Sequence, residues 1–195
     1  MTAPTTDHGH PTGEVPVLNI ANALTVLRVV LVPVFVVMFA VADAQDPWWR
    51  VGAFLVFAAA MATDYVDGHL ARTLGLVTDF GKIADPIADK ALIAAAMISL
   101  SVFGELFWWV TIVILVREVG ITLWRLLGVD YVVAAGRGGK LKTVAQSVGL
   151  GMLILPLPHW VWPIEWAVLG VALVLTVYTG VEYLVKARRA AAAGR

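Results

Sequence analysis

The residues best suited to chemistry lie between positions 64 and 90, in the stretch DYVDGHLARTLGLVTDFGKIADPIADK. Four aspartates in it form two pairs: Asp64 and Asp67 are three residues apart, and Asp85 and Asp89 are four apart. Residues at these spacings share a helix face, so two antiparallel helices could present both pairs to each other. Four carboxylates meeting there would repel one another without a cation, and their oxygens suit Mg²⁺ or Mn²⁺. Two such ions could clamp a transferring phosphoryl group.

Three other residues fit that chemistry. Gly68 and Gly81 have no Cβ, so a ligand or another backbone can approach them closely. The planar guanidinium of Arg72 suits a diphosphate. A single aspartate at a helix end is usually a cap, and Asp79 is expected to cap the helix that follows it. For the four paired aspartates, the alternative to a metal site is an ion or proton relay of the kind that transporters use.

The elements that position these residues are expected to be membrane-spanning helices. The chain has 195 residues, of which 60% are hydrophobic and only 14% charged, and its mean hydropathy is +0.85. A typical soluble domain has fewer apolar residues, about 45–50%, and more charged ones, about 25%. We therefore predict an all-α integral membrane protein with six transmembrane helices in one bundle. After an interfacial segment at 15–22, the expected spans are about 23–42, 51–72, 80–102, 107–127, 141–157 and 164–185.

The distribution of basic residues predicts the orientation of the bundle. With the N-terminus inside, the outer connections hold Arg50 and nothing else basic, whereas the inner ones hold Arg72, Lys82, Arg125, Arg137, Lys140, Lys142, Lys186, Arg188 and Arg189. This asymmetry follows the positive-inside rule. It places both termini and a polar, metal-containing cavity on the cytoplasmic side of a bacterial-type inner membrane.

The remaining segments set the expected boundaries. Residues 1–14 are expected to be a disordered extension without the features of a signal peptide, 15–189 the six-helix domain, and 190–195 a flexible tail. The chain has no cysteine, which excludes a Cys-based metal site. No nucleic-acid partner is expected.

The motif D-x-x-D-G-x-x-A-R-x8-G-x3-D-x3-D, from Asp64 to Asp89, resembles the signature of the CDP-alcohol phosphotransferases. The resemblance implies transfer of a phosphatidyl group from a CDP-linked lipid to an alcohol with release of CMP, and it suggests a homodimer. It also implies that Asp64, Asp67, Asp85 and Asp89 hold two divalent cations and that Asp89 is the general base. Gly68, Ala71, Arg72 and Gly81 would lie along the cytidine diphosphate.

Further segments resemble one branch of that family, the bacterial phosphatidylglycerophosphate synthases. They are NIANALTVLR at 19–28 with Pro33, the Arg117–Glu118 pair, and GKLKTVAQ at 139–146. The resemblance implies CDP-diacylglycerol and sn-glycerol 3-phosphate as substrates. It also suggests that Asn22, Thr25 and Arg28 line the nucleotide or its entrance.

Basic residues near the aspartates favour an acceptor that carries a phosphate. Arg117 and Arg125 are eight residues apart and share a helix face, and Lys140 and Lys142 follow a basic loop. These four are the candidate acceptor-phosphate residues. The alternative for the loop cations is a role in topology or in binding anionic lipid head groups. Other acceptors, inositol phosphate or phosphatidylglycerol, and a cation-coupled transporter remain as alternatives.

Overall fold

The computed structural model describes residues 19–41, 45–73, 78–126 and 137–193. Within these ranges, the side chains of residues 21, 65–73, 79, 80, 82, 83, 125, 126, 137, 138, 140, 187 and 190–193 lie outside the description. The described chain is all-helical, as the sequence predicts. Its elements are α1 (Ile20–Ala40), α2 (Pro47–Thr73), α3 (Asp79–Val102), α4 (Trp108–Leu126), α5 (Arg137–Ile154), the short 3-10 helix η2 (His159–Val161) and α6 (Trp162–Ala193).

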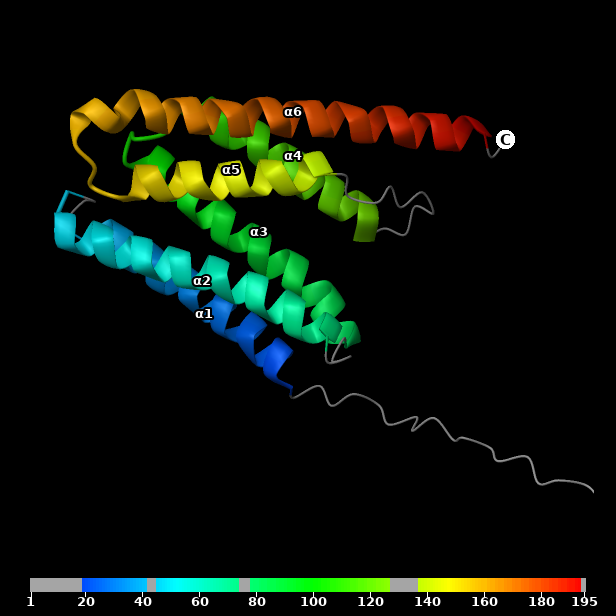
Figure 1. The fold of residues 1–195 in the computed structure, drawn as a ribbon, viewed down its shortest axis with the longest axis horizontal. Coiled ribbons are helices and arrows are strands. Elements are labelled where there is room, and N and C mark those ends of the chain that lie inside the picture. The colour runs from blue at the N-terminus through cyan, green and yellow to red at the C-terminus, as the bar shows by residue number, and fades with distance from the viewer. Residues whose placement is uncertain (1–18, 42–44, 74–77, 127–136, 194–195) are drawn as a thin grey trace, which may run out of the picture.

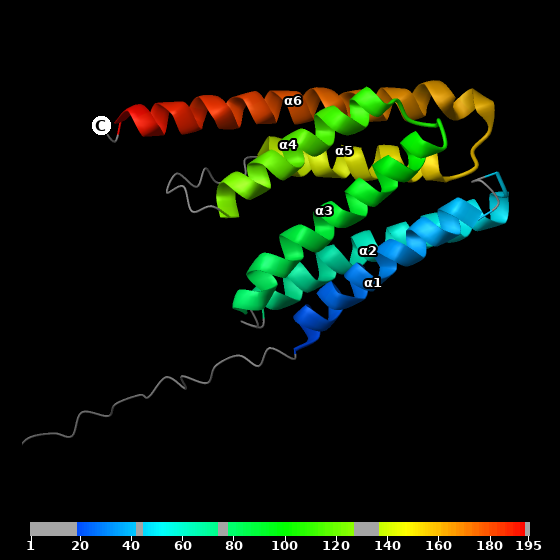
Figure 2. The same cartoon turned by 180° about the vertical axis from the view of Figure 1, so that it is seen from behind.

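The six α-helices run up and down the bundle. α1 and α2 lie together along one edge, α5 and α6 along the other, and α3 crosses between them (Figure 1). Seen from behind, α4 lies against α3 and α6 (Figure 2). The first residues of α3 and the last residues of α2 therefore share one end of the bundle with the beginning of α1. We call this the aspartate end, because Asp64, Asp85 and Asp89 lie in its half of α2 and α3.

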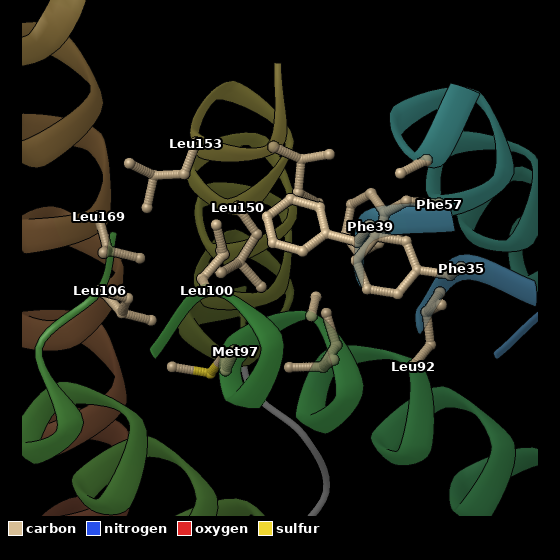
Figure 3. Packing of buried hydrophobic residues seen from close by; sticks show 14 of the residues in the cluster. Phe35, Phe39, Phe57, Leu92, Met97, Leu100, Leu106, Leu150, Leu153 and Leu169 are labelled. Atoms are coloured by element: carbon tan, nitrogen blue, oxygen red, sulfur yellow. The ribbon is translucent and has the colours of Figure 1, made fainter. Parts of the chain in front are cut away.

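An aromatic and aliphatic core fixes α1 against α2 and α3. Phe35 of α1 stacks on Phe39 with ring centroids 5.8 Å apart, and it meets Phe57 of α2 at 6.0 Å. Leu92 of α3 lies below this group, and Leu150 of α5 approaches from the far side (Figure 3). The core is continuous across the bundle, so a shift of α1 would move the face of α3 that carries Asp85.

The helix starts near the aspartate end differ from two expectations. The side chain of Asn19 caps α1 by accepting the N–H of Asn22 at 3.0 Å, so the helix begins at Ile20 rather than at 23. Thr78 caps α3 by accepting the N–H of Gly81 at 3.0 Å. The prediction that Asp79 is this cap is wrong, because Asp79 is the first residue inside the helix.

Helices α5 and α6 are also displaced from their expected bounds. α5 begins at Arg137 and ends at Ile154, so Lys140 and Lys142 lie in its first turns, and the helix stops before Pro156. α6 continues to Ala193, which makes residues 190–193 helical beyond the boundary expected at Arg189. The reason is the alanine run, because alanine has the highest helix propensity.

The opposite end of the bundle is held by Arg50 of α2. Its guanidinium meets both carboxylate oxygens of Glu105, at 2.5 and 2.6 Å, and donates to the Ile154 carbonyl at 2.9 Å. The turn before Glu105 uses Gly104 at φ +77°, a conformation that glycine adopts without strain. The one basic residue of the expected outer connections thus ties α2 to the ends of α3 and α5.

The outer surface of the bundle is rich in aliphatic side chains. Val37 is 60% exposed, Leu55 61%, and Val116 and Val174 both 67%. Two helical segments of the described chain are long and apolar enough to cross a membrane, Asn22–Ala40 and His159–Lys186. Exposed apolar surface of this kind is typical of helices that face lipid.

Candidate active site

Three of the four candidate metal ligands have described side chains. Asp64 lies on α2, and Asp85 and Asp89 lie one turn apart on α3. The negative charges of Asp85 and Asp89 both act on the Asp64 carboxylate. Among the described side chains no group of three carboxylates or imidazoles is close enough to hold one ion. The fourth candidate, Asp67, belongs to α2 three residues after Asp64, and its side chain lies outside the description.

Helix α1 contributes polar side chains that contact these carboxylates. Arg28 is fully buried, and its Nη1 lies 2.8 Å from Oδ1 of Asp64. Thr25 donates its hydroxyl to Oδ1 of Asp85. Asn22 donates to the hydroxyl of Thr78, the α3 cap, at 2.9 Å. The three residues are spaced by three and share one face of α1. The structure thus brings this face of α1 onto the acidic faces of α2 and α3.

Gly81 permits the close approach of α1 to α3. A Cβ built on Gly81 would lie 3.0 Å from Oδ1 of Asn22, 3.3 Å from the Thr78 hydroxyl and 3.7 Å from Oδ2 of Asp85. Any larger residue would push on the Asn22 amide. Gly81 thus lets α1 and α3 approach closely without displacing the Asn22 amide.

The other candidate nucleotide residues, Gly68, Ala71 and Arg72, belong to the last turns of α2. Their side-chain positions lie outside the description, as do those of the candidate acceptor residues Arg125 and Lys140. Their roles stay predictions.

A second charged group lies beside the aspartates, centred on Glu118 of α4. Glu118 is only 3% exposed. Its Oε1 accepts from Lys142 of α5 and from Arg117, whose Nη1 is 3.0 Å away, and its Oε2 lies 2.6 Å from Nζ of Lys90. We call Lys90, Arg117, Glu118 and Lys142 the Glu118 cluster. Three cations against one carboxylate give the cluster a formal charge of +2, which favours binding of a phosphate.

Helix α6 fixes the position of Arg117 in this cluster. Its Nη2 donates to the hydroxyl of Thr179 at 2.9 Å. A Cβ on Gly180 would lie 3.2 Å from Cγ of Arg117, so the glycine makes room for the arginine stem. Two of the four candidate acceptor residues, Arg117 and Lys142, are therefore brought together from different helices.

Sequence reasoning missed Lys90 and Thr179 and gave Glu118 no role. Lys90 directly follows Asp89, and adjacent residues of a helix do not share a face, so spacing gave no sign of a contact. Thr179 is a single hydroxyl in an apolar helix and carries no sequence signal. Of these three residues, only Glu118 could have been recognised from the sequence, because it is a lone acid beside a cation in an apolar segment.

Known proteins match the part of the chain that contains these site residues. The family model described as CDP-alcohol phosphatidyltransferase matches residues 18–178. A Mycobacterium tuberculosis protein named "Probable phosphatidylglycerophosphate synthase" is 45% identical over 182 residues, covering 93% of this chain and 87% of the relative.

Two further relatives carry the name "CDP-diacylglycerol--glycerol-3-phosphate 3-phosphatidyltransferase". The Bacillus subtilis protein is 40% identical over 86% of this chain and 94% of its own length. The Escherichia coli K12 protein is 38% identical over 87% of this chain and 95% of its own length. The matched region contains the aspartate motif, the face of α1 and the Glu118 cluster. This chain belongs to the CDP-alcohol phosphatidyltransferase family.

Proposed function

We propose that this chain transfers the phosphatidyl group of CDP-diacylglycerol to sn-glycerol 3-phosphate and releases CMP. The observation that carries the proposal is the position of the positive Glu118 cluster directly beside Asp89, with Lys90 in contact with both. An acceptor phosphate at the cluster would bring its own hydroxyl near the Asp89 carboxylate. The names of the relatives, at 38–45% identity, support the same substrates.

The donor set fits divalent cations. Asp64, Asp85 and Asp89 offer only carboxylate oxygens, the ligands that Mg²⁺ and Mn²⁺ prefer. Arg28 pairs with Asp64 and Lys90 with Asp89, so among the described side chains these three carboxylates meet only two cations. We infer that Asp64, Asp67, Asp85 and Asp89 hold two such ions. When bound, the ions neutralise charge on the diphosphate.

The chain's own residues then have distinct roles. Asp89 accepts the proton of the glycerol hydroxyl while the hydroxyl oxygen forms a bond to the lipid-side phosphorus. The bond from that phosphorus to the bridging oxygen breaks, and CMP leaves with the electron pair. Arg117 and Lys142, with Arg125 and Lys140, neutralise the acceptor phosphate. Gly68, Ala71, Arg72 and Gly81 lie along the cytidine diphosphate.

The residues of α1 contact the carboxylates as well as lying where the resemblance places the nucleotide. Thr25 contacts Asp85, Arg28 contacts Asp64, and Asn22 contacts the α3 cap. We infer that these three orient the carboxylates and form the wall of the nucleotide site on that side. Their contribution to nucleotide binding is then largely indirect.

The environment of the site is inferred to be the cytoplasmic face of the bacterial inner membrane. The six helices would all span the bilayer, with the aspartate end inside, because the basic residues concentrate there. CDP-linked lipids and glycerol 3-phosphate then reach the site from the membrane and the cytoplasm. A homodimer is the expected assembly.

The decisive experiment measures CMP release from CDP-diacylglycerol by the detergent-solubilised protein. We expect release with glycerol 3-phosphate, and none with inositol phosphate or phosphatidylglycerol as the acceptor. Asp89→Asn should abolish release while the protein stays folded. The matched control is Asp46→Asn at the opposite end of the bundle, where Asp46 only caps α2 through the N–H of Trp48 at 2.8 Å.

Three results would contradict the proposal. Full turnover by Asp89→Asn would exclude its role as the base. Product formation only with another acceptor would move the chain to a sister activity of the same family. Cation flux in liposomes without CMP release would favour a transporter.

A further inference from the structure

Lys90 lies between the two functional groups of the site. Its Nζ is 2.6 Å from Oε2 of Glu118 on α4 and 3.3 Å from Oδ2 of Asp89, its neighbour on α3. Among the described side chains, Lys90 is the one cation that pairs with the Asp89 carboxylate. It is also the one member of the Glu118 cluster that comes from the helix carrying Asp85 and Asp89.

The contact between Lys90 and Asp89 is not a consequence of their sequence positions. Consecutive residues of an α-helix point about 100° apart, so their side chains ordinarily diverge. The ammonium of Lys90 also pairs with the buried Glu118 across the helix interface, so it is held between the two carboxylates. The lysine side chain is 27% exposed and the Asp89 side chain 18% exposed, which limits the screening of their attraction by solvent.

The two contacts of the Lys90 ammonium differ in length. Its Nζ is 2.6 Å from Glu118 and 3.3 Å from Asp89, so the closer pairing is with Glu118. The contact with Asp89 is an electrostatic attraction that restrains the orientation of the carboxylate.

We propose that Lys90 is a positioning residue that, anchored by Glu118, orients the Asp89 carboxylate toward the acceptor held at the same cluster. The inference rests on the proposed function, in which Asp89 is the general base. It assigns Glu118 a role that no phosphate contact requires: the carboxylate gathers Lys90, Arg117 and Lys142 from three helices and links them to the base. Acceptor binding and proton removal are thereby set by one cluster.

The test uses steady-state CMP release by Lys90→Met with varied glycerol 3-phosphate. We expect kcat to fall by about 10- to 100-fold, as for other residues that orient a functional group, with a smaller change in the KM of CDP-diacylglycerol. Lys90→Arg can still bridge two carboxylates and should recover part of kcat. The control is Lys186→Met, which removes an exposed lysine paired with Glu182 at 2.5 Å on α6 and should leave kcat unchanged.

A double variant separates positioning from simple charge compensation. Lys90→Met leaves the buried Glu118 with one cation fewer, which by itself could distort the site. Lys90→Met with Glu118→Gln removes both charges. If Lys90 positions Asp89, the double variant keeps the low kcat, and it stays less stable than the wild type because Arg117 and Lys142 lose their carboxylate. Recovery of kcat to the wild-type value would overturn the inference.

Metal binding supplies a readout that does not depend on turnover. We expect Lys90→Met to bind Mn²⁺, without either substrate, no more weakly than the wild type, because removal of a cation favours cation binding nearby. Mn²⁺ binding that falls in parallel with kcat would show that Lys90 builds the metal site instead, and would overturn the inference. An inactive wild type would refute the proposed function; an active wild type matched by Lys90→Met refutes only the role of Lys90.

Discussion

Gly81→Ala tests whether the close approach of α1 and α3 shapes the site. The new Cβ would lie 3.0 Å from Oδ1 of Asn22, so the amide must move. That movement disrupts two contacts between Asn22 and Thr78, at 2.9 and 3.1 Å, with a net cost of about 1 kcal/mol. Alanine loses less backbone conformational entropy than glycine on folding, which offsets about 0.5–1 kcal/mol of this cost.

The matched control is Gly120→Ala on α4, whose Cβ would meet nothing within 4 Å. This variant should gain about 0.5–1 kcal/mol, because alanine is the better helix former. Adding the 3.3 Å contact that the Gly81 Cβ would make with the Thr78 hydroxyl, we expect the two variants to differ by about 1–2 kcal/mol in the free energy of unfolding. For a chain of this size that corresponds to a Tm difference of about 2–8 °C.

The assay is thermal unfolding in detergent, combined with CMP release. We expect Gly81→Ala also to lower kcat/KM about tenfold or more, since Thr25 and Asp85 move with the displaced helix. In an Asn22→Ala background the same substitution should cost much less stability, because the obstructing amide is gone. The reasoning is refuted if Gly81→Ala is as stable and as active as Gly120→Ala.

Three further substitutions or treatments test other parts of the structure. Arg50→Met leaves Glu105 unpaired at the far end of the bundle, so it should lower the free energy of unfolding by about 2–4 kcal/mol and leave kcat unchanged. Unaltered stability in a denaturation assay would contradict this. Thr25→Val should lower kcat about 10- to 100-fold in a CMP-release assay with the fold retained, and equal activity would exclude its role at Asp85. Chelation with EDTA should abolish CMP release and added Mg²⁺ should restore it, whereas activity that survives EDTA would argue against the carboxylates as metal ligands.

The sequence alone determines the helical class, the family and which residues of one helix share a face. These properties are local: apolar runs of helical length predict the six helices, and spacings of three or four put Asp85 with Asp89 and Asn22 with Thr25 on common faces. The helix ends were less predictable, because they depend on caps such as Thr78 and on the strong propensity of the alanine run before Ala193.

Only the tertiary structure decides which faces meet. Arg28 and Asp64 are 36 positions apart, and Thr25 and Asp85 are 60 apart. Glu118 collects cations from α3 and α5, and nothing in its spacing to Lys90 or Lys142 indicates this. The physical reason is that periodicity fixes a residue's direction on its own helix, whereas its partner depends on how the apolar core rotates and tilts each helix against its neighbours. The four aspartates could therefore be singled out from the sequence, but the contacts that Thr25, Arg28 and Lys90 make with them could not.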